Sequence, residues 1–260
     1  MGSRFSKLSK DRTHRKGKGK GKGKSKGKGK APQISGPTGG LQMIPTPQRD
    51  ESGRPILPQS FEINREQLIR AFEYMADYIH RQGTTLTIFI AGGAVNTIYL
   101  HSRHTTGDVD FFGSNEHSRL LKDASKYAQE RSQARLGANW FNNSMSLFLN
   151  RDIEQDLIQA SVQQGTIVFN RPGLLVYAVC WEYALCGKAD RLGKPARREY
   201  DIGDAVAFLH QYVSENGGIA VPAEQVEAWT RKYNKAVSVS VLEEINAVYK
   251  SQYGNIGILF

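Results

Sequence analysis

The segment from residue 91 to residue 113 constrains the fold more than any other part of the 260-residue chain. It follows a run of apolar residues, 84–91, that is typical of a buried strand. Gly92 and Gly93 then allow a tight turn and a close approach of the backbone to a bound phosphate. A short helix and a second strand are expected to follow this turn.

Two aspartates, Asp108 and Asp110, lie on the expected second strand with Val109 between them. Alternate residues of a strand point to the same face, so both carboxylates should face one side while Val109 enters the core. Two convergent carboxylates suit Mg²⁺ or Mn²⁺ that also contacts the phosphates of a substrate. The sequence therefore predicts a divalent-cation site on this strand.

These residues resemble the nucleotidyltransferases of the DNA polymerase β superfamily. The shared pattern is a Gly-Gly turn after a strand, here Gly92-Gly93, followed by Arg-x-Ser/Thr-Thr-x-Asp-hydrophobic-Asp, here residues 103–110. The chain is most similar to a branch of small stand-alone transferases that includes AbiEii-type toxins and aminoglycoside nucleotidyltransferases. The resemblance covers residues 84–213, and it is weaker beyond the first block.

The resemblance implies an enzyme that moves a nucleoside monophosphate from a nucleoside triphosphate to an unknown acceptor. The aspartate pair would bind Mg²⁺, and the glycine pair would face the β- and γ-phosphates. Arg103 would pair with phosphate, and Thr106 would form a hydrogen bond near the metal. Arg103 by itself is equally consistent with a surface ion pair.

The weaker downstream match assigns roles to two further residues. Lys188 near the end of an expected helix would contact the nucleotide, with Arg191 on the same helical face. Asp201 opens the next expected helix, and Asp204 in its first turn would act as a general base for the acceptor. These residues also fit a solvated basic face and favourable charge at a helix start, so both interpretations stay open.

One departure from the superfamily pattern favours an alternative function. The superfamily usually has a third carboxylate on a later strand beside the first two. The later strands expected at residues 166–170 and 174–180 contain neither Asp nor Glu, and Asn170 is their nearest polar substitute. The alternative is a pseudoenzyme that binds nucleotide without transferring it. A third hypothesis is an interaction protein that binds only through its basic tail.

The basic tail at residues 1–31 dominates the charge of the chain. The formal net charge is +10, yet this tail alone holds thirteen Lys or Arg against a single acid, Asp11. Its Lys-Gly repeats predict a disordered arm that binds an anionic membrane or nucleic acid without reading sequence. Gly2 and Ser6 match the N-myristoylation pattern, and an acyl chain beside basic residues anchors stably. A chance match is the alternative, since many cloned chains begin Met-Gly-Ser.

The rest of the chain predicts an α+β fold. Residues 32–60 are proline-rich and indicate a linker, residues 61–180 a nucleotidyltransferase-like core with a small mixed sheet, and residues 181–260 a helical subdomain. The absence of a transmembrane segment and of a secretory signal favours an intracellular, cytoplasmic protein, peripheral to a membrane if its tail is acylated. Two cysteines, Cys180 and Cys186, are expected as buried free thiols.

Local signals place most elements of this fold. A capping box at Asn64 and Gln67 predicts a helix that ends near Gly83. Ser114 is expected to cap a helix that runs to about residue 134, and Arg171-Pro172-Gly173 predicts a turn between two strands. Further helices are expected at residues 152–162, 181–192, 201–214, 222–233 and 240–253. Four aromatic residues are expected in the core rather than stacked on a nucleobase, which is the alternative: Trp140, Phe141, Phe148 and Tyr177.

Overall fold

A computed structural model describes residue 43, residues 48–56 and residues 61–260, which belong to one compact unit. The basic tail, Gly2 and most of the expected linker lie outside the described residues. Within that linker, residues 48–56 form a hairpin of two short antiparallel strands, β1 (Gln48–Arg49) and β2 (Pro55–Ile56). Asp50 Oδ1 organises its turn, because it accepts hydrogen bonds from the backbone N–H groups of Ser52 and Arg54.

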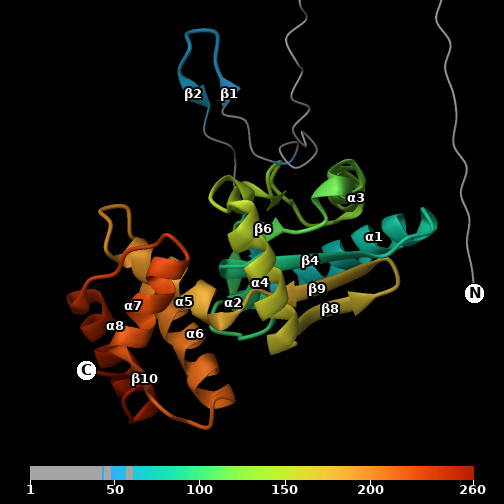
Figure 1. Cartoon of the computed structure of the whole chain (residues 1–260). Coiled ribbons are helices and arrows are strands. Elements are labelled where there is room, and N and C mark those ends of the chain that lie inside the picture. The colour runs from blue at the N-terminus through green and yellow to red at the C-terminus, as the bar shows by residue number, and fades with distance from the viewer. Residues whose placement is uncertain (1–42, 44–47, 57–60) are drawn as a thin grey trace, which may run out of the picture. The chain divides into compact units, whose positions relative to one another are not determined.

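A five-stranded mixed sheet forms the centre of the fold and confirms the α+β prediction (Figure 1). The strands run in the order β7-β6-β4-β9-β8. The β4–β9 and β6–β7 pairs are parallel, whereas the β4–β6 and β8–β9 pairs are antiparallel. Their bounds are β4 (Leu86–Ala91), β6 (Val109–Phe112), β7 (Phe141–Asn142), β8 (Ile167–Arg171) and β9 (Leu174–Ala178).

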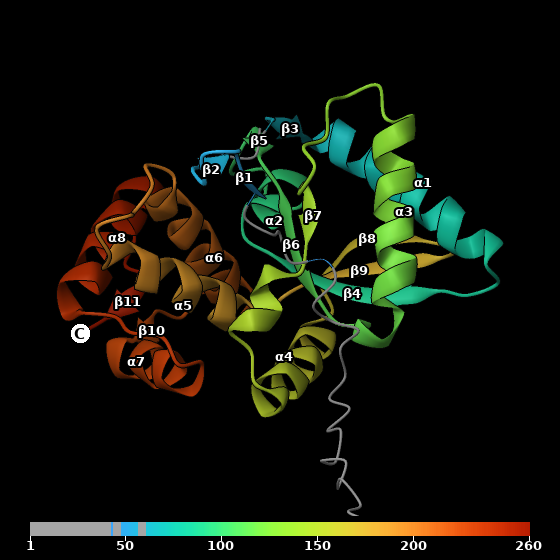
Figure 2. The ribbon, with the colours of Figure 1, turned by 90° about the horizontal axis from the view of Figure 1, so that it is seen from above.

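Helices cover both faces of this sheet. Figures 1 and 2 show α1 and α3 side by side on one face, and α4 against the other face. The short helix α2 leads from β4 toward β6. The helices and 3₁₀ turns of this part are α1 (Arg65–Arg81), α2 (Gly93–Ile98), η2 (Asn115–His117), α3 (Ser118–Arg131), η3 (Ser144–Leu147) and α4 (Arg151–Gln164).

The start of α1 illustrates how local sequence sets an element. Asn64 accepts a hydrogen bond from the Gln67 backbone N–H, and the Gln67 side chain accepts one from the Asn64 backbone, so the predicted capping box is confirmed. Leu68, Phe72 and further apolar residues at helical spacing are fully buried. The chain leaves the helix at Gly83, whose φ of +75° few other residues adopt.

The second half of the chain is a group of packed helices, drawn in orange and red in Figure 1. In this group α5 packs against α6 and α7, and α6 packs against α8. Both cysteines are buried free thiols, as predicted. The elements not yet given are β3 (Ile63–Asn64), β5 (Thr105–Thr106), α5 (Trp181–Leu192), α6 (Asp201–Glu215), β10 (Val221–Pro222), α7 (Ala223–Lys232), α8 (Val239–Tyr253) and β11 (Ile258–Leu259).

Two local predictions are wrong. Ser114 does not cap a helix, because it adopts a left-handed conformation with φ of +51° and its hydroxyl donates to the Thr87 carbonyl. A 3₁₀ turn follows it, and α3 begins only at Ser118. Phe148 is not in the core: 69% of its surface is exposed, whereas Trp140 and Phe141 are buried as expected and Tyr177 is partly buried.

No helix among the residues that the structure describes is long and apolar enough to span a bilayer.

Candidate functional site

The two aspartates lie at the start of β6. Val109 between them is fully buried, so the alternating pattern predicted from the sequence holds at this strand. Asp110 pairs with Ala91 of β4 on one side and with Asn142 of β7 on the other. Asp108 precedes the strand, and its backbone carbonyl accepts a 3.2 Å hydrogen bond from the Thr106 hydroxyl. This bond fixes the chain immediately before the aspartate pair.

The environment of the pair disfavours negative charge on both carboxylates. Desolvation and then the neighbouring Asp108 raise the pKa of Asp110 to about 6, well above the ordinary value for an aspartate. Asp108 is exposed, but partial desolvation by the surrounding protein also raises its pKa, against the lowering effect of the nearby cations. A divalent cation between the two carboxylates would relieve this cost, because it replaces repulsion with attraction.

Asn142 occupies the place beside Asp110 where the superfamily resemblance expects a third carboxylate. Its amide lowers the pKa of Asp110 against the effect of desolvation, and its Nδ2 donates to the Asn139 carbonyl at 3.4 Å. Its amide oxygen faces elsewhere, since it accepts the Ser144 backbone N–H at 3.0 Å. Asn170, the substitute expected from the sequence, lies on β8 at the opposite edge of the sheet, and two strands, β4 and β9, separate it from β6. The third position is therefore filled by a neutral donor.

The glycine turn lies directly against two other predicted site residues. Gly92 has φ of +68°, which strongly favours glycine. A Cβ on Gly93 would lie 2.8 Å from Arg103 Nη1 and even closer to Thr106 Oγ1. Gly93 is thus required for close packing, and the structure brings Gly93, Arg103 and Thr106 together.

A buried ion-pair cluster lies beside the aspartate pair. Lys188 Nζ is 2.9 Å from Asp201 Oδ1 and 2.7 Å from Asp204 Oδ2. Arg103 Nη1 approaches Asp204 Oδ2 at 3.4 Å, which connects the loop after α2 to α6. Burial opposes ionisation of Asp201, but the Arg198 backbone N–H and Lys188 lower its pKa overall. The contacts assign Asp204 to holding Lys188 and Arg103, which leaves its predicted role as a general base without support.

Tyr200 forms a platform for the cations of this cluster. The Arg103 guanidinium carbon lies 3.9 Å from the centre of its ring, and Lys188 Nζ lies 5.5 Å from it. Arg198 donates a 2.7 Å hydrogen bond to its hydroxyl. Arg103, Lys188, Arg198 and Arg191 all act electrostatically on Asp108. Asp108 and Asp110 therefore share one region with four cations and the two acids of α6, and Arg191 and Arg198 are the cations there that do not pair with those acids.

Sequence reasoning missed Asn142 and Tyr200. A two-residue strand such as β7 carries almost no local signal, so the neighbour of Asp110 could not be read from the chain. Tyr200 was detectable in principle, because it lies between Arg198 and Asp201 in the segment that the resemblance covers.

The described residues contain no group of three or more His, Cys, Asp or Glu side chains that could hold a metal ion by themselves.

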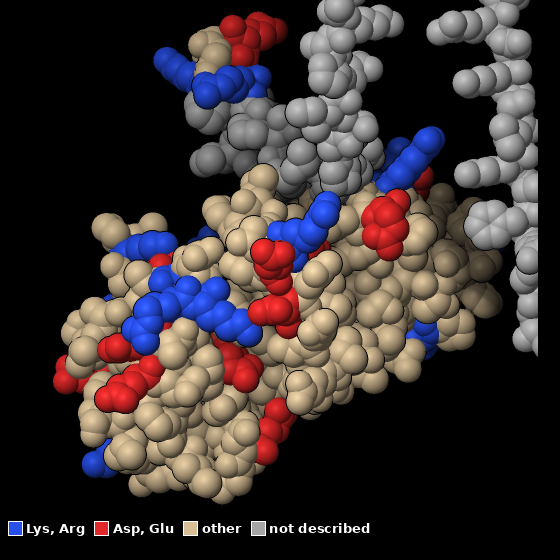
Figure 3. Space-filling view, viewed as in Figure 1, with Lys and Arg blue, Asp and Glu red and all other residues tan. Residues whose placement is uncertain are grey.

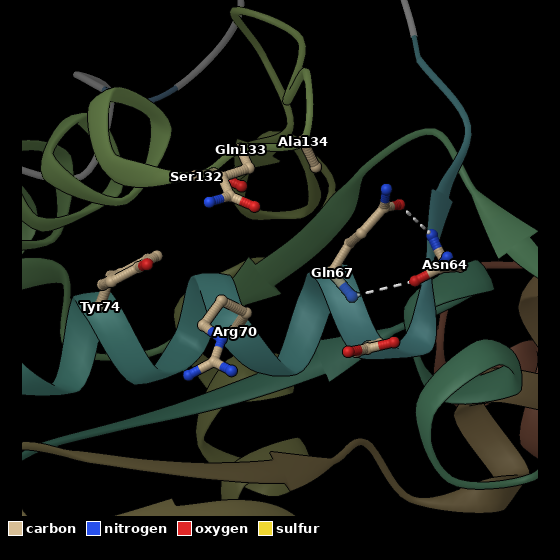
Figure 4. A pocket seen from close by; sticks show the side chains of 8 residues that line it. Asn64, Gln67, Arg70, Tyr74, Ser132, Gln133 and Ala134 are labelled. Carbon is tan, nitrogen blue, oxygen red and sulfur yellow. Dashed lines mark hydrogen bonds between the residues drawn. The ribbon is translucent and has the colours of Figure 1, made fainter.

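Two other surface features lie apart from these residues. The hollow in Figure 4, with a volume of about 490 Å³, lies between the start of α1 and the segment after α3. It is lined by Asn64, Arg70, Tyr74 and other polar groups, and by none of the candidate residues. Figure 3 shows Lys and Arg side chains gathered over the region of α5 and α7, with acidic side chains over α4. Lys232 of α7 and Asp156 of α4 form a 3.4 Å ion pair there.

Comparison with known proteins identifies the family of this chain. Residues 61–256 match a family described as Domain of unknown function (DUF7582), and the chain belongs to that family. No curated protein matches the chain, and no solved structure matches it.

Proposed function

We propose that this DUF7582 domain is a nucleotidyltransferase that binds a nucleoside triphosphate with Mg²⁺ or Mn²⁺ and transfers the monophosphate to an acceptor. The observation that carries the proposal is the combination of Asp108 and Asp110, at the start of one strand, with four cations around them. The cations do not simply form ion pairs with Asp108 and Asp110, because Lys188 and Arg103 already pair with acids of α6. The arrangement suits a cation and a polyanion bound together.

The residues fit one divalent cation better than two. The pKa of Asp110 is raised to about 6 by desolvation and by Asp108, so the pair gains from a bound cation. Mg²⁺ commonly uses one or two protein carboxylates and completes its shell with water and substrate phosphates. Asn142 presents its amide donor to Asp110 and its oxygen to Ser144, so it adds no ligand. The bound cation would supply charge neutralisation for the phosphates.

The protein groups would bind and orient the nucleotide. Gly93 leaves room beside Arg103 and Thr106, where a side chain would clash. Arg103 and Arg198 carry positive charge on the side of Asp108, and this charge would stabilise the triphosphate and the pyrophosphate that leaves. Asp204 keeps the cations of Lys188 and Arg103 in place through its contacts with both. The acceptor remains a hydroxyl or phosphate group of unassigned origin.

Pyrophosphate release tests this proposal. The full chain is incubated with each labelled nucleoside triphosphate and Mg²⁺ or Mn²⁺, with small-molecule, protein and RNA acceptors. The expected result is pyrophosphate release that Asp108→Asn together with Asp110→Asn abolishes. An interaction protein that binds only through its tail would show no nucleotide binding at this site. In that case the double variant would bind the same partners as the wild type.

A second candidate is supported by Asn142. A nucleotide-binding pseudoenzyme would bind the triphosphate and the cation in the same place without transfer, because the third carboxylate is replaced by a neutral amide. Calorimetry distinguishes it from the enzyme. Binding that depends on Asp108 and Asp110, without pyrophosphate release under all acceptors, would establish the pseudoenzyme.

The tail supplies a proposal about location. Residues 1–31 would attach an intracellular, cytoplasmic protein to an anionic membrane or a nucleic acid, and an acyl chain on Gly2 would strengthen membrane attachment. Mass spectrometry of the native N-terminus tests acylation, and an unmodified Gly2 or Met1 would refute it. Sedimentation with phosphatidylserine vesicles, compared with neutral vesicles and with a chain that lacks residues 1–31, tests the electrostatic part.

A further inference from the structure

The most exposed aromatic ring of the described chain lies close to the aspartate pair. Phe148 directly follows η3, and η3 packs against β6, the strand that carries Asp110. The Phe148 side chain is 69% exposed, and the adjacent Leu147 is 56% exposed. The exposed part of such a ring contributes no hydrophobic free energy to folding, because its apolar surface remains in contact with water. A ligand that covers it would recover this free energy.

Tyr183 and Lys235 connect this ring to the aspartate pair. Tyr183 of α5 is close enough to Asp110 for the carboxylate to contribute, after desolvation and Cys180, to the raised pKa of its phenol. Lys235 Nζ lies 5.9 Å from the centre of the Tyr183 ring and 5.8 Å from that of Phe148. Lys235 therefore lies near both the exposed Phe148 ring and the buried Tyr183 ring, and Asp110 is in the neighbourhood of Tyr183.

The opposite side of the aspartate pair is basic. Arg198 and Arg103 are the cations that act most strongly on Asp108, and neither is among those that influence Asp110 most. Arg103 also lies against Gly93. The site thus has Arg103 and Arg198 beside Asp108, and the Phe148 ring with Lys235 on the side of η3.

We propose that the nucleobase of the bound triphosphate stacks on Phe148, an inference that rests on the proposed function. A nucleoside triphosphate has the same polarity as the site, with its negative charge at one end and a flat aromatic base at the other. Its triphosphate lies at the Arg103 end and its base reaches the exposed ring next to Lys235. Stacking on an aromatic side chain accepts every base, because each base presents a π-face.

Titration calorimetry with two probes tests the inference. ATP and inorganic tripolyphosphate are each titrated with Mg²⁺ into the full chain and into the Phe148→Ala and Phe148→Trp variants. We expect Phe148→Ala to weaken ATP binding about tenfold and to leave tripolyphosphate binding unchanged, since only ATP carries a base. Phe148→Trp should restore ATP binding. Phe260→Ala removes another exposed ring, 59% exposed at the end of the chain, and should change neither affinity.

Each remaining outcome overturns the inference. Equal ATP affinities of the wild type and Phe148→Ala would refute it and leave the proposed function intact. Parallel losses for ATP and tripolyphosphate would show that the variant damages the site as a whole. A wild-type chain that binds neither probe would refute the proposed function, and the inference with it.

Discussion

Asp110 and Asn142 are paired residues on the neighbouring parallel strands β6 and β7, and the Asn142 amide lowers the pKa of Asp110 against the desolvation that raises it. The pairing gives a precise chemical difference from the superfamily pattern, in which a third carboxylate lies beside the first two. An amide at this place stabilises a charged Asp110 but offers no negative charge to a cation. The choice between transfer and simple binding therefore depends on one side chain.

Substitution of Asn142 by aspartate should create a site that depends on metal for stability. In the absence of divalent cations, the free energy of unfolding should fall by about 1–3 kcal/mol, because a third carboxylate repels two that are already desolvated. Mn²⁺ should restore the loss, and pyrophosphate release should rise if the missing charge limits transfer. Urea denaturation with and without Mn²⁺ measures the effect.

Asn150→Asp is the matched control for this variant. Asn150 caps α4 through a hydrogen bond from the Ile153 N–H, a role that aspartate also performs. Its stability should not depend on Mn²⁺. If Asn142→Asp is as stable as the wild type in the absence of metal, the new carboxylate does not lie close to those of Asp108 and Asp110.

The raised pKa of Asp110 predicts how stability depends on pH. The pKa is about 6 in the folded protein and about 3.9 in an unfolded chain. Between these values the folded state keeps a proton that the unfolded state has lost, so Asp110 makes stability decrease as pH rises through this window. The loss is complete above about pH 6 and amounts to about 3 kcal/mol at most.

Denaturation at a series of pH values measures this effect as a difference between wild type and Asp110→Asn. The variant should lack the decrease, whereas Asp123→Asn, which changes an exposed aspartate of α3, should keep it. Parallel curves for wild type and Asp110→Asn would contradict the prediction. Mn²⁺ affinity should also weaken as pH falls below about 6, because protons compete with the metal for the carboxylate.

Loss of Lys188 should destabilise the fold strongly. Lys188→Met leaves Asp201 and Asp204, whose side chains are at most 1% exposed, without their shared ammonium group. Breaking a buried pair of this kind costs about 3–5 kcal/mol. Lys194→Met is the control, because Lys194 is 59% exposed in its pair with Asp190 and such pairs contribute less than about 1 kcal/mol. Equal losses in the two variants, measured by urea denaturation, would show that Lys188 is not buried in solution.

A methyl group at Gly93 should disturb the nucleotide site. It would lie 2.8 Å from Arg103 Nη1 and closer to Thr106 Oγ1, so both side chains must move. We expect a loss of about 1–3 kcal/mol in the free energy of unfolding and weaker binding of tripolyphosphate with Mg²⁺. Gly203→Ala is the control: its Cβ meets nothing within 4 Å in α6, and the helix should gain about 0.5–1 kcal/mol. Unchanged tripolyphosphate affinity in Gly93→Ala would separate the glycine turn from phosphate binding.

Elements with strong local signals were predictable from the sequence. The residues of α5 are those expected, and the turn at Arg171-Pro172-Gly173 joins β8 to β9 as predicted. In both cases, neighbouring residues carry the signal: a run of helix formers in the first, and Pro-Gly chemistry in the second. The α+β class follows from the order of such elements.

Elements that depend on distant partners were not predictable. Strand β7 exists because residues 141 and 142 pair with β6, and the Val109 N–H donates to the Trp140 carbonyl at 2.6 Å. Phe148 was expected in the core on composition alone, yet the short turn η3 turns it to the surface. Asp110 lies on its expected strand and Asp108 directly precedes it. The neighbours of the pair from β7, α5 and α6 come from tertiary packing, which local patterns do not encode.

The contact between Arg103 and Asp204 joins residues 101 positions apart. During synthesis, the β6 carboxylates therefore leave the ribosome long before the acids that fix Lys188 and Arg103. The nascent N-terminal half carries the aspartates and Arg103, but it lacks Lys188, Arg191, Arg198 and the acids of α6 until these later segments emerge. Under the proposed function, affinity for a polyphosphate would be acquired only when α6 has docked, and a chain truncated before α6 would not bind its ligand.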